Sequence, residues 1–227
     1  MTYVMSDLHG RYEQYAKMLE RIRFSEQDEL YILGDVVDRG PQPIRILLDM
    51  SARPNVHPIL GNHELMAIPL LAALSSAPPR TAEAETAMEK WLSDGGETTL
   101  AGFLGHSSDD RVRILDYLGS FVPYRELTVE GAQFILVHAG MDDFDPNRPL
   151  CTYSLRSLVT AHTDYTRRYF PDRYLVTGHI PTGLIAPGYG GRIYRANGHI
   201  AMDCGNGWGG TLGCLRLEDM EEFYVAP

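Results

Sequence analysis

The chain has 227 residues, of which 44% are hydrophobic, and 20 basic residues against 30 acidic residues give it a net charge of −10. This length is enough to bury a core without disulfide bonds and is typical of one domain. Lys and Arg form no cluster anywhere in the sequence, and this distribution argues against a nucleic-acid binder, which usually has a basic patch.

The first third of the chain alternates between predicted strands and helices. Short apolar runs that predict strands occupy residues 3–6, 30–33 and 56–60. Helices are predicted between and after these runs, at residues 12–22, 41–50 and 65–74. This alternation is typical of parallel strands joined by crossover helices. Each run ends in a polar cluster, at the edge where open α/β sheets usually bind ligands.

The segment from about residue 75 to residue 120 has a different composition. A loop is predicted at residues 75–79, where Pro78 and Pro79 lie. Residues 81–92 are rich in Ala and Glu and predict a helix that stops at a pair of glycines, and residues 112–118 predict a short amphipathic helix. We interpret this segment as a helical insertion in a single domain of residues 1–227, placed where it would cover a cleft.

The rest of the chain predicts strands that pair mainly as hairpins. Glu130-Gly131 is a turn signal between predicted strands at residues 121–129 and 133–137. Further strands are predicted at residues 174–177, 192–195, 199–203, 212–217 and 223–225. A parallel first half and a hairpin-rich second half predict an α/β fold with two sheets.

Side chains that bind metals follow several of these strands. The candidate ligands are Asp7, His9, Asp35, Asn62, His138 and His179. Six ligands exceed the need of one tetrahedral ion but suit two ions that share a carboxylate. Carboxylate, imidazole and amide groups are compatible with Mn²⁺, Fe or Zn²⁺. Two such ions would bind phosphate oxygens and acidify a bridging water, and the resulting hydroxide would attack phosphorus directly.

Two further residues would complete such a site. The leaving group needs a proton, and His63 directly follows Asn62. The phosphate needs another cation, and Arg39 follows Asp35 by four residues with a planar guanidinium that matches phosphate.

The order of these blocks resembles a known family. The blocks are Asp7-x-His9-Gly10, Gly34-Asp35-Val36-Val37-Asp38-Arg39-Gly40, Gly61-Asn62-His63-Glu64, His138-Ala139-Gly140 and Gly178-His179. Together they resemble the calcineurin-like metallophosphoesterases, and more closely the phosphoprotein phosphatase branch with its bacterial and phage serine/threonine phosphatases. The resemblance covers about residues 4–180 and implies a sandwich of two mixed β-sheets flanked by helices.

The resemblance also implies a role for each residue. Asp7 and His9 would bind the first metal ion, Asp35 would bridge the two ions, and the second ion would be bound by Asn62, His138 and His179. By the same resemblance His63 is the general acid, Asp38 orients it, and Arg39 binds the phosphate. The implied cofactors are two divalent ions, with Mn²⁺ expected and Fe or Zn as alternatives.

Three positions depart from the family pattern. Ser6 replaces the usual Gly before the first Asp, and Ile180 replaces the usual Thr after Gly178-His179. The family's second phosphate-binding Arg has no secure counterpart here. Arg156 and His162 are the two candidates for that position, and a histidine there would bind phosphate more weakly or in a pH-dependent way.

The expected activity is hydrolysis of phosphomonoesters, with phosphoserine or phosphothreonine proteins as the leading substrates. The alternative is a bis(5′-nucleosyl)-tetraphosphatase, which has the same blocks. Glu64 matches the protein phosphatase pattern, whereas tetraphosphatases more often have Asp at that position. A third hypothesis is a non-catalytic metal-binding module, but His63 and Arg39 are both retained. The expected partner is therefore a phosphorylated protein or a small phosphoester.

The sequence also bears on the cellular compartment. Its three cysteines are scattered without C-x-x-C spacing, so we expect no disulfide framework. No window approaches the roughly 18 apolar residues of a membrane span, and residues 1–10 do not resemble a signal peptide. We therefore expect a cytoplasmic protein without membrane association.

Two tryptophans have simple structural interpretations. Trp91 is expected to anchor the core of the helical insertion. Trp208 lies in the glycine-rich stretch 205–210 and is expected to pack within that loop rather than to contact substrate.

Overall fold

In the computed structural model, which describes residues 1–76 and 81–227, the described strands form two five-stranded sheets. The first sheet has the strand order β10-β9-β1-β2-β3. Its strands are β1 (Thr2–Met5), β2 (Glu29–Leu33), β3 (Val56–Ile59), β9 (Leu212–Arg216) and β10 (Glu221–Val225). β1, β2 and β3 are parallel, while β9 and β10 add antiparallel strands beyond β1.

The second sheet has the strand order β4-β5-β6-β8-β7. Its strands are β4 (Tyr124–Val129), β5 (Ala132–Val137), β6 (Arg173–Thr177), β7 (Tyr194–Ala196) and β8 (His199–Ala201). The hairpin predicted around Glu130-Gly131 is confirmed, and both residues have positive φ, 48° and 80°. Such φ values match the twist of paired strands in a two-residue turn. Both sheets are mixed, so the predicted fold class is confirmed.

Alternation along β1 shows how the first sheet is covered on both faces. Tyr3 and Met5 point into the core shared with the helices, whereas Val4 belongs to the core between the two sheets. Successive strand residues face opposite sides of a sheet, so one short apolar run supplies both cores. Phe134 and Leu136 of β5 provide the facing side chains from the second sheet.

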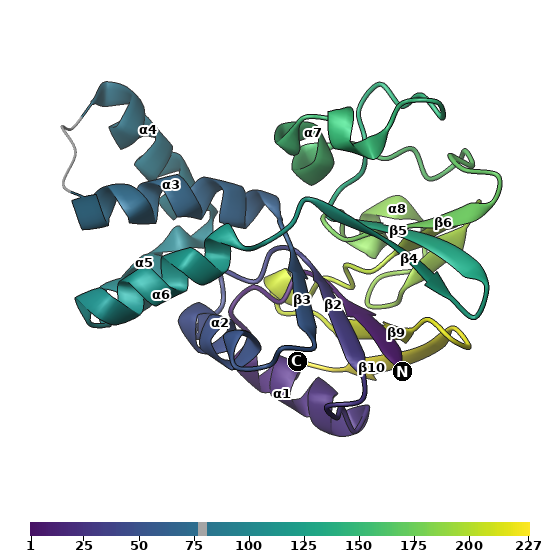
Figure 1. Cartoon of the computed structure of the whole chain (residues 1–227), viewed down its shortest axis with the longest axis horizontal. Coiled ribbons are helices and arrows are strands. Elements are labelled where there is room, and N and C mark those ends of the chain that lie inside the picture. The colour runs from purple at the N-terminus through teal and green to yellow at the C-terminus, as the bar shows by residue number, and fades with distance from the viewer. Residues whose placement is uncertain (77–80) are drawn as a thin grey trace.

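The helices flank this sandwich (Figure 1). α1 (Tyr12–Arg21) and α2 (Pro43–Ser51) connect the parallel strands, and Pro43 starts α2 because proline suits the first helical turn. The short helices in the second half of the chain are η2 (Leu150–Thr152), α7 (Leu155–Thr160), α8 (Thr182–Ile185) and η3 (Asn206–Trp208). No helix in the described ranges combines the length and apolar character that crossing a membrane would require.

A group of helices projects to one side of the sandwich (Figure 1). It contains α3 (Asn62–Ser76), α4 (Ala82–Trp91), a kinked segment (Leu92–Gly96) with non-helical backbone at Asp94 and Gly95, α5 (Glu97–Leu104) and α6 (Ser108–Gly119). The predicted loop at 75–79 was wrong at its first two residues, because α3 continues through Ser76. Residues 77–79 of the predicted loop lie outside the described residues. That this group is an insertion within one domain stays a prediction.

Candidate metal and phosphate site

The two sheets bring their strand ends together at one place. Asp7, Asp35 and Asn62 follow the parallel strands β1, β2 and β3, whose carboxyl ends lie at one edge. His138 and His179 follow β5 and β6, which are parallel neighbours in the second sheet. The two sheets therefore meet across a single set of polar side chains.

Backbone hydrogen bonds join these strand ends. The His9 amide donates to the Asp35 carbonyl at 2.8 Å, and the Asp7 amide donates to the Gly34 carbonyl at 3.1 Å. Gly34 has φ +77°, and a Cβ there would lie 2.6 Å from the Cα of Gly61. Only glycine tolerates both conditions. This explains why a glycine precedes Asp35.

Strained backbone is concentrated at this edge. The predicted site residues with positive φ are Asp7, His9, Asp35, Asp38, Arg39 and His179, with values between 43° and 70°. Left-handed φ is uncommon for residues other than glycine and persists only where the surrounding structure imposes it. The direction of these side chains is therefore set by a strained loop backbone, and this strain costs free energy.

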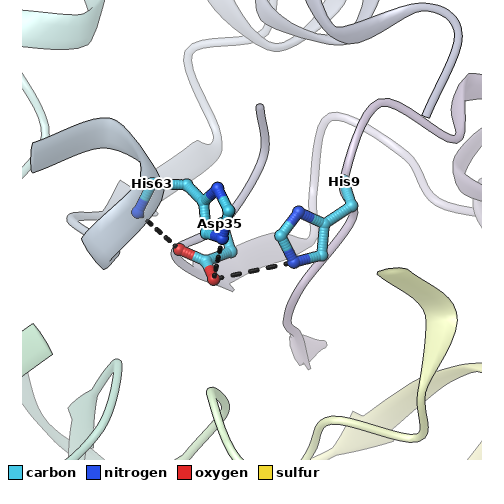
Figure 2. A group of neighbouring side chains, drawn as sticks. All are labelled: His9, Asp35 and His63. Atoms are coloured by element: carbon cyan, nitrogen blue, oxygen red, sulfur yellow. Dashed lines mark hydrogen bonds and ion pairs between the residues drawn. The ribbon is translucent and has the colours of Figure 1, made fainter. Parts of the chain in front are cut away.

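The carboxylate of Asp35 lies at the centre of the site (Figure 2). One oxygen, Oδ2, is 3.6 Å from His9 Nε2 and 3.9 Å from His63 Nε2. The other, Oδ1, is 3.4 Å from His138 Nε2. His9, Asp35 and His63 form one group of clustered donor atoms, and Asp35, His138 and His179 form a second. Asp35 is the member common to both.

On the first side, His9 is fully buried. Its Nδ1 lies 3.0 Å from the Val37 carbonyl, so a neutral ring donates from Nδ1 and leaves a lone pair on Nε2. That Nε2 lies 2.9 Å from Nη1 of Arg39. Burial lowers the pKa of His9 to about 3 against the opposing effect of the Asp35 charge, and the charges of His63 and Arg39 lower it further. A neutral imidazole with a fixed lone pair is the form that binds a metal.

On the second side, His138 faces oxygen acceptors. Its Nδ1 lies 2.6 Å from the Leu33 carbonyl, while Nε2 lies 2.9 Å from Asn62 Oδ1 and 3.4 Å from Asp35 Oδ1. Burial lowers its pKa, but the charge and hydrogen bond of Asp35, together with the charge of Asp7 and the Leu33 carbonyl, raise the pKa to about 10. A lone pair that faces two oxygens is unfavourable unless a proton or another cation lies between them. The donor atoms around His138 therefore fit a metal ion.

Buried acidic residues add to this need for positive charge. Burial raises the pKa of Asp7 well above its usual range, and the charge of Asp203 raises it further. Burial likewise raises the pKa of Asp203 to about 6. His179 lies beside Asp7, and its backbone amide donates to the Asp7 carboxylate at 3.2 Å. Burial, and after it the charge of His138, lowers the pKa of His179 to about 4. Ionised buried carboxylates require compensating cations, so the residues present fit a centre of divalent ions.

His63 and Asp38 form a second buried pair beside Asp35. His63 Nδ1 lies 2.7 Å from Asp38 Oδ2. Trp91 donates from Nε1 to the same oxygen at 2.8 Å, and Thr99 donates from Oγ1 to Asp38 Oδ1 at 2.6 Å. Burial lowers the pKa of His63, but the carboxylates of Asp35 and Asp38 outweigh it and raise the pKa. Sequence reasoning missed Thr99 and assigned Trp91 to packing alone, because both belong to the helical segment.

Arg39 connects this pair to the rest of the site. Its Nη2 lies 3.0 Å from His63 Nε2 and donates to Asp94 Oδ1 at 2.9 Å. Asp94 Oδ2 is 3.7 Å from His63 Nε2, and the Asp94 side chain is 42% exposed. Asp94 was not predicted as a site residue. The one signal for it is its position directly before the glycine pair that stops the predicted helix.

Glu64 has a structural function that its sequence position did not reveal. Its carboxylate accepts hydrogen bonds from the backbone amides of Gly61, Asp35, Val36 and Val37, at 2.8–3.1 Å. It therefore holds the loop that carries Asp35 against the start of α3. Its side chain is fully buried, so Glu64 stabilises the packing of this loop and does not contact a substrate.

The two candidates for a second phosphate-binding residue lie elsewhere. Arg156 is on α7 and exposed, and in the described part of the chain its side chain has no hydrogen bond or ion pair with a site residue. His162 is also exposed, but its charge contributes to the lowered pKa of His179. His162 is therefore the nearer of the two to the site.

Trp208 does not pack within its loop as expected. Its side chain is 69% exposed, and its ring lies 4.3 Å from the guanidinium carbon of Arg39. The interpretation as loop packing was wrong, because the surrounding glycines offer no side chains to bury the ring.

Comparison with known proteins identifies relatives of this chain. The sequence matches the family described as calcineurin-like phosphoesterase over residues 2–197. It is 32% identical over 142 residues to a protein from Delftia acidovorans named symmetrical bis(5′-nucleosyl)-tetraphosphatase. That alignment covers 61% of this chain and 44% of the relative, so the chain matches less than half of the relative's length.

Solved structures show the same fold at low sequence identity. A crystal structure described as that of a candidate diadenosine tetraphosphatase superposes with a TM-score of 0.66 at 18% identity, covering 99% of this chain and 92% of that one. A protein serine/threonine phosphatase from Saccharomyces cerevisiae superposes with a TM-score of 0.55 at 12% identity, covering 99% and 78%. Because both kinds of enzyme share the fold, the fold alone does not distinguish their substrates.

Proposed function

The chain belongs to the calcineurin-like phosphoesterase family, and on that premise we propose that it hydrolyses dinucleoside polyphosphates with the help of two divalent metal ions. The observation that carries this substrate class is the 32% identity to a relative named symmetrical bis(5′-nucleosyl)-tetraphosphatase. We therefore prefer the tetraphosphatase activity, which the sequence suggested as the alternative, over the expected protein phosphatase activity.

The site geometry removes the main sequence argument against this choice. Glu64 was the residue that favoured a protein phosphatase, but its carboxylate is fully occupied by backbone amides of the Asp35 loop and of Gly61. A residue buried in this way contacts no substrate. Its identity is therefore consistent with either substrate class.

We propose that the metal ions are held by Asp7, His9, Asp35, Asn62, His138 and His179, with Asp35 common to both. Mn²⁺ is the proposed ion, and Fe and Zn²⁺ suit the same donors. When bound, such ions supply positive charge to the phosphate oxygens and activate water.

The proposed contribution of the chain itself is to hold the phosphate and to move a proton. Asp38 fixes the Nδ1 proton of His63, so that Nε2 is the atom that donates to the leaving oxygen. The carboxylates of Asp35 and Asp38 raise the pKa of His63 and so favour the protonated form that can donate. Arg39 presents its guanidinium beside both His63 and His9, where it binds phosphate oxygens in a bidentate way.

The second candidate function is a serine/threonine protein phosphatase. It is favoured by the five sequence blocks, which resemble the phosphoprotein phosphatase branch. The hypothesis of a non-catalytic module stays the third alternative.

The deciding experiment compares kcat/KM of the Mn²⁺-loaded protein on diadenosine tetraphosphate and on a phosphothreonine peptide. We expect a preference for the dinucleotide, with two molecules of ADP as products of symmetrical cleavage. ATP and AMP as products would contradict the symmetrical assignment, and a preference for the peptide would establish the second candidate. Metal-loaded protein inactive on both substrates would favour the non-catalytic module.

His63→Asn serves as the matched blank for this measurement. Loss of a general acid lowers kcat by about 10²–10⁴-fold, while the metal content should stay at the wild-type level because the ligands are intact. Equal activity of the variant and the wild type would refute the assigned role of His63.

A further inference from the structure

The loop that carries Trp208 is built tightly against the metal site. Asn206 donates from Nδ2 to the carbonyls of Asp7 and Leu8, at 3.1 and 2.9 Å. A Cβ at Gly207 would lie 2.2 Å from Cδ2 of His9, so only glycine lets the loop approach so closely. The position of Trp208 is thus determined by the residues that hold the candidate metals.

Although its backbone is held in this way, the Trp208 side chain is 69% exposed. Its indole ring lies over the guanidinium of Arg39, with 4.3 Å between the ring centroid and Cζ. A large aromatic ring left in water beside a phosphate-binding arginine offers a surface on which another flat ring can stack.

Arg11 lies next to the same loop. A Cβ at Gly40 would lie 3.0 Å from Cγ of Arg11, and a Cβ at Gly209 would lie 3.7 Å from its Nη2. The Arg11 side chain therefore extends from Gly40, which follows Arg39, to Gly209, which follows Trp208, with its guanidinium at the Gly209 end.

The Arg11 side chain also lacks a partner. Its Nε is buried without a hydrogen bond, and within residues 1–76 and 81–227 its guanidinium forms no hydrogen bond or ion pair. Guanidinium groups with unused donors are suited to bidentate binding of a phosphate. Both the Arg11 guanidinium and the Arg39 guanidinium therefore lie against the Trp208 loop, in a chain that has no secure counterpart of the family's second phosphate-binding arginine.

We propose that Trp208 and Arg11 form a nucleotide subsite beside the phosphate position at Arg39. Trp208 stacks on the base, and Arg11 binds a phosphate adjacent to the one at Arg39. This subsite rests on the proposed function, since it takes a nucleoside diphosphate moiety of a dinucleoside polyphosphate. Its ligand chemistry is a planar ring joined to at least two phosphates.

The base is tested with two ligands that differ only in the base, AMP and ribose 5-phosphate. Their dissociation constants are measured by calorimetry on metal-loaded wild type, Trp208→Ala and Trp208→Phe. Base stacking on an aromatic residue corresponds to about 5- to 150-fold in affinity. We expect Trp208→Ala to reduce the preference for AMP over ribose 5-phosphate by about that factor, and Trp208→Phe to retain most of it. An unchanged preference in Trp208→Ala would overturn the stacking role.

Tryptophan fluorescence gives a readout that needs no turnover. The sequence contains two tryptophans, and Trp91 is fully buried whereas Trp208 is exposed. AMP should therefore quench mainly the emission of Trp208, which is the part missing in Trp208→Phe. Bound AMP should also protect this emission from quenching by acrylamide. Equal quenching by AMP in the wild type and in Trp208→Phe would contradict the subsite.

Arg11 is tested with ADP and AMP, which differ by one phosphate. Arg11→Gln should reduce the preference for ADP by about tenfold, the loss expected for a charged hydrogen bond. Arg167→Gln is the matched control, because Arg167 is an exposed arginine that lies over Phe144 and Tyr169 in another part of the molecule. Equal preference for ADP in wild type and Arg11→Gln would remove Arg11 from the subsite.

These results are separable from those on the proposed function. Protein that binds AMP through Trp208 but does not cleave diadenosine tetraphosphate would keep the subsite and refute the activity. Protein that cleaves the dinucleotide with no dependence on Trp208 or Arg11 would keep the activity and refute the subsite.

Discussion

On one side of the Asp35 carboxylate, the buried His9 imidazole faces the guanidinium of Arg39; on the other, the buried His138 imidazole faces Asn62 and acidic residues. In both rings Nδ1 lies within hydrogen-bond distance of a backbone carbonyl. Yet the pKa of His9 is lowered to about 3 and that of His138 is raised to about 10. Burial lowers the pKa in both, so the difference comes from the neighbouring charges.

This difference determines what must leave each side when a metal ion binds. At His138 a proton must leave, because the ring is protonated at neutral pH without a metal. At His9 the ring is already neutral, but Nη1 of Arg39 must move away from its lone pair. Metal binding at His9 is therefore expected to release Arg39 for the phosphate.

Asp35→Asn should have the largest effect, because Asp35 is the one residue that both sides share. Removing a residue that only hydrogen-bonds to a metal ligand lowers metal affinity by about 10- to 100-fold. Removing Asp35, a ligand shared by both sides, should therefore lower the affinity by more than this. We expect the variant to retain less than one equivalent of metal and to lose activity to the level of the chelated wild type. Metal analysis after dialysis against a weak chelator is the measurement. Two retained ions per chain would show that the sides do not depend on Asp35.

Proton release should distinguish the two sides directly. His138 has a raised pKa of about 10, so metal must displace its proton below that pH, and the affinity on this side should rise by about tenfold per pH unit near neutrality. His9, with its lowered pKa of about 3, releases none. Calorimetry of metal uptake in buffers of different ionisation enthalpy counts the protons. Uptake with no proton release at pH 7 would contradict the protonated state of His138.

Thr99→Val tests the His9 side, where the Asp38–His63 pair lies. The substitution removes the 2.6 Å hydrogen bond to Asp38 Oδ1, and a lost buried hydrogen bond lowers kcat by about tenfold if it is expressed in the transition state. The loss should be larger for substrates with poor leaving groups, which need a proton from His63, than for 2,4-dinitrophenyl phosphate.

Thr99→Ser is the matched control for this substitution, because it keeps the hydroxyl. Equal losses of kcat on good and poor leaving groups in Thr99→Val would indicate a general structural defect rather than misplacement of Asp38.

Asp94→Asn should have the smallest effect. The Asp94 carboxylate pairs with Arg39 at 2.9 Å but is 42% exposed, and such pairs contribute about 0.2–1 kcal/mol. Removing its charge should free Arg39 for phosphate and lower KM by about 1.4- to fivefold. Asp110→Asn is the control, since Asp110 is similarly exposed at 40% and pairs with Arg113 in α6. A raised KM in Asp94→Asn would show that Asp94 orients Arg39 instead of competing for it.

The sequence by itself determined the family, the two-sheet fold and the identity of the residues that converge at the site. The family followed from the resemblance of five sequence blocks, whereas the convergence has a local reason: Asp7, Asp35, Asn62, His138 and His179 each follow an apolar strand, and strand ends in parallel sheets meet at one edge. Short-range patterns were therefore sufficient to predict their positions.

Only the tertiary structure decided what these residues contact. Trp91 and Thr99 bind Asp38 from helices more than 50 positions along the chain, and no local pattern distinguishes such residues from ordinary core residues. The exposure of Trp208, and the lack of a partner for the Arg11 guanidinium among the described residues, likewise depend on which neighbours the fold supplies. Hydrogen bonding and burial are properties of the packed chain, so the charge on each side of Asp35 could not be predicted before the sheets were in place.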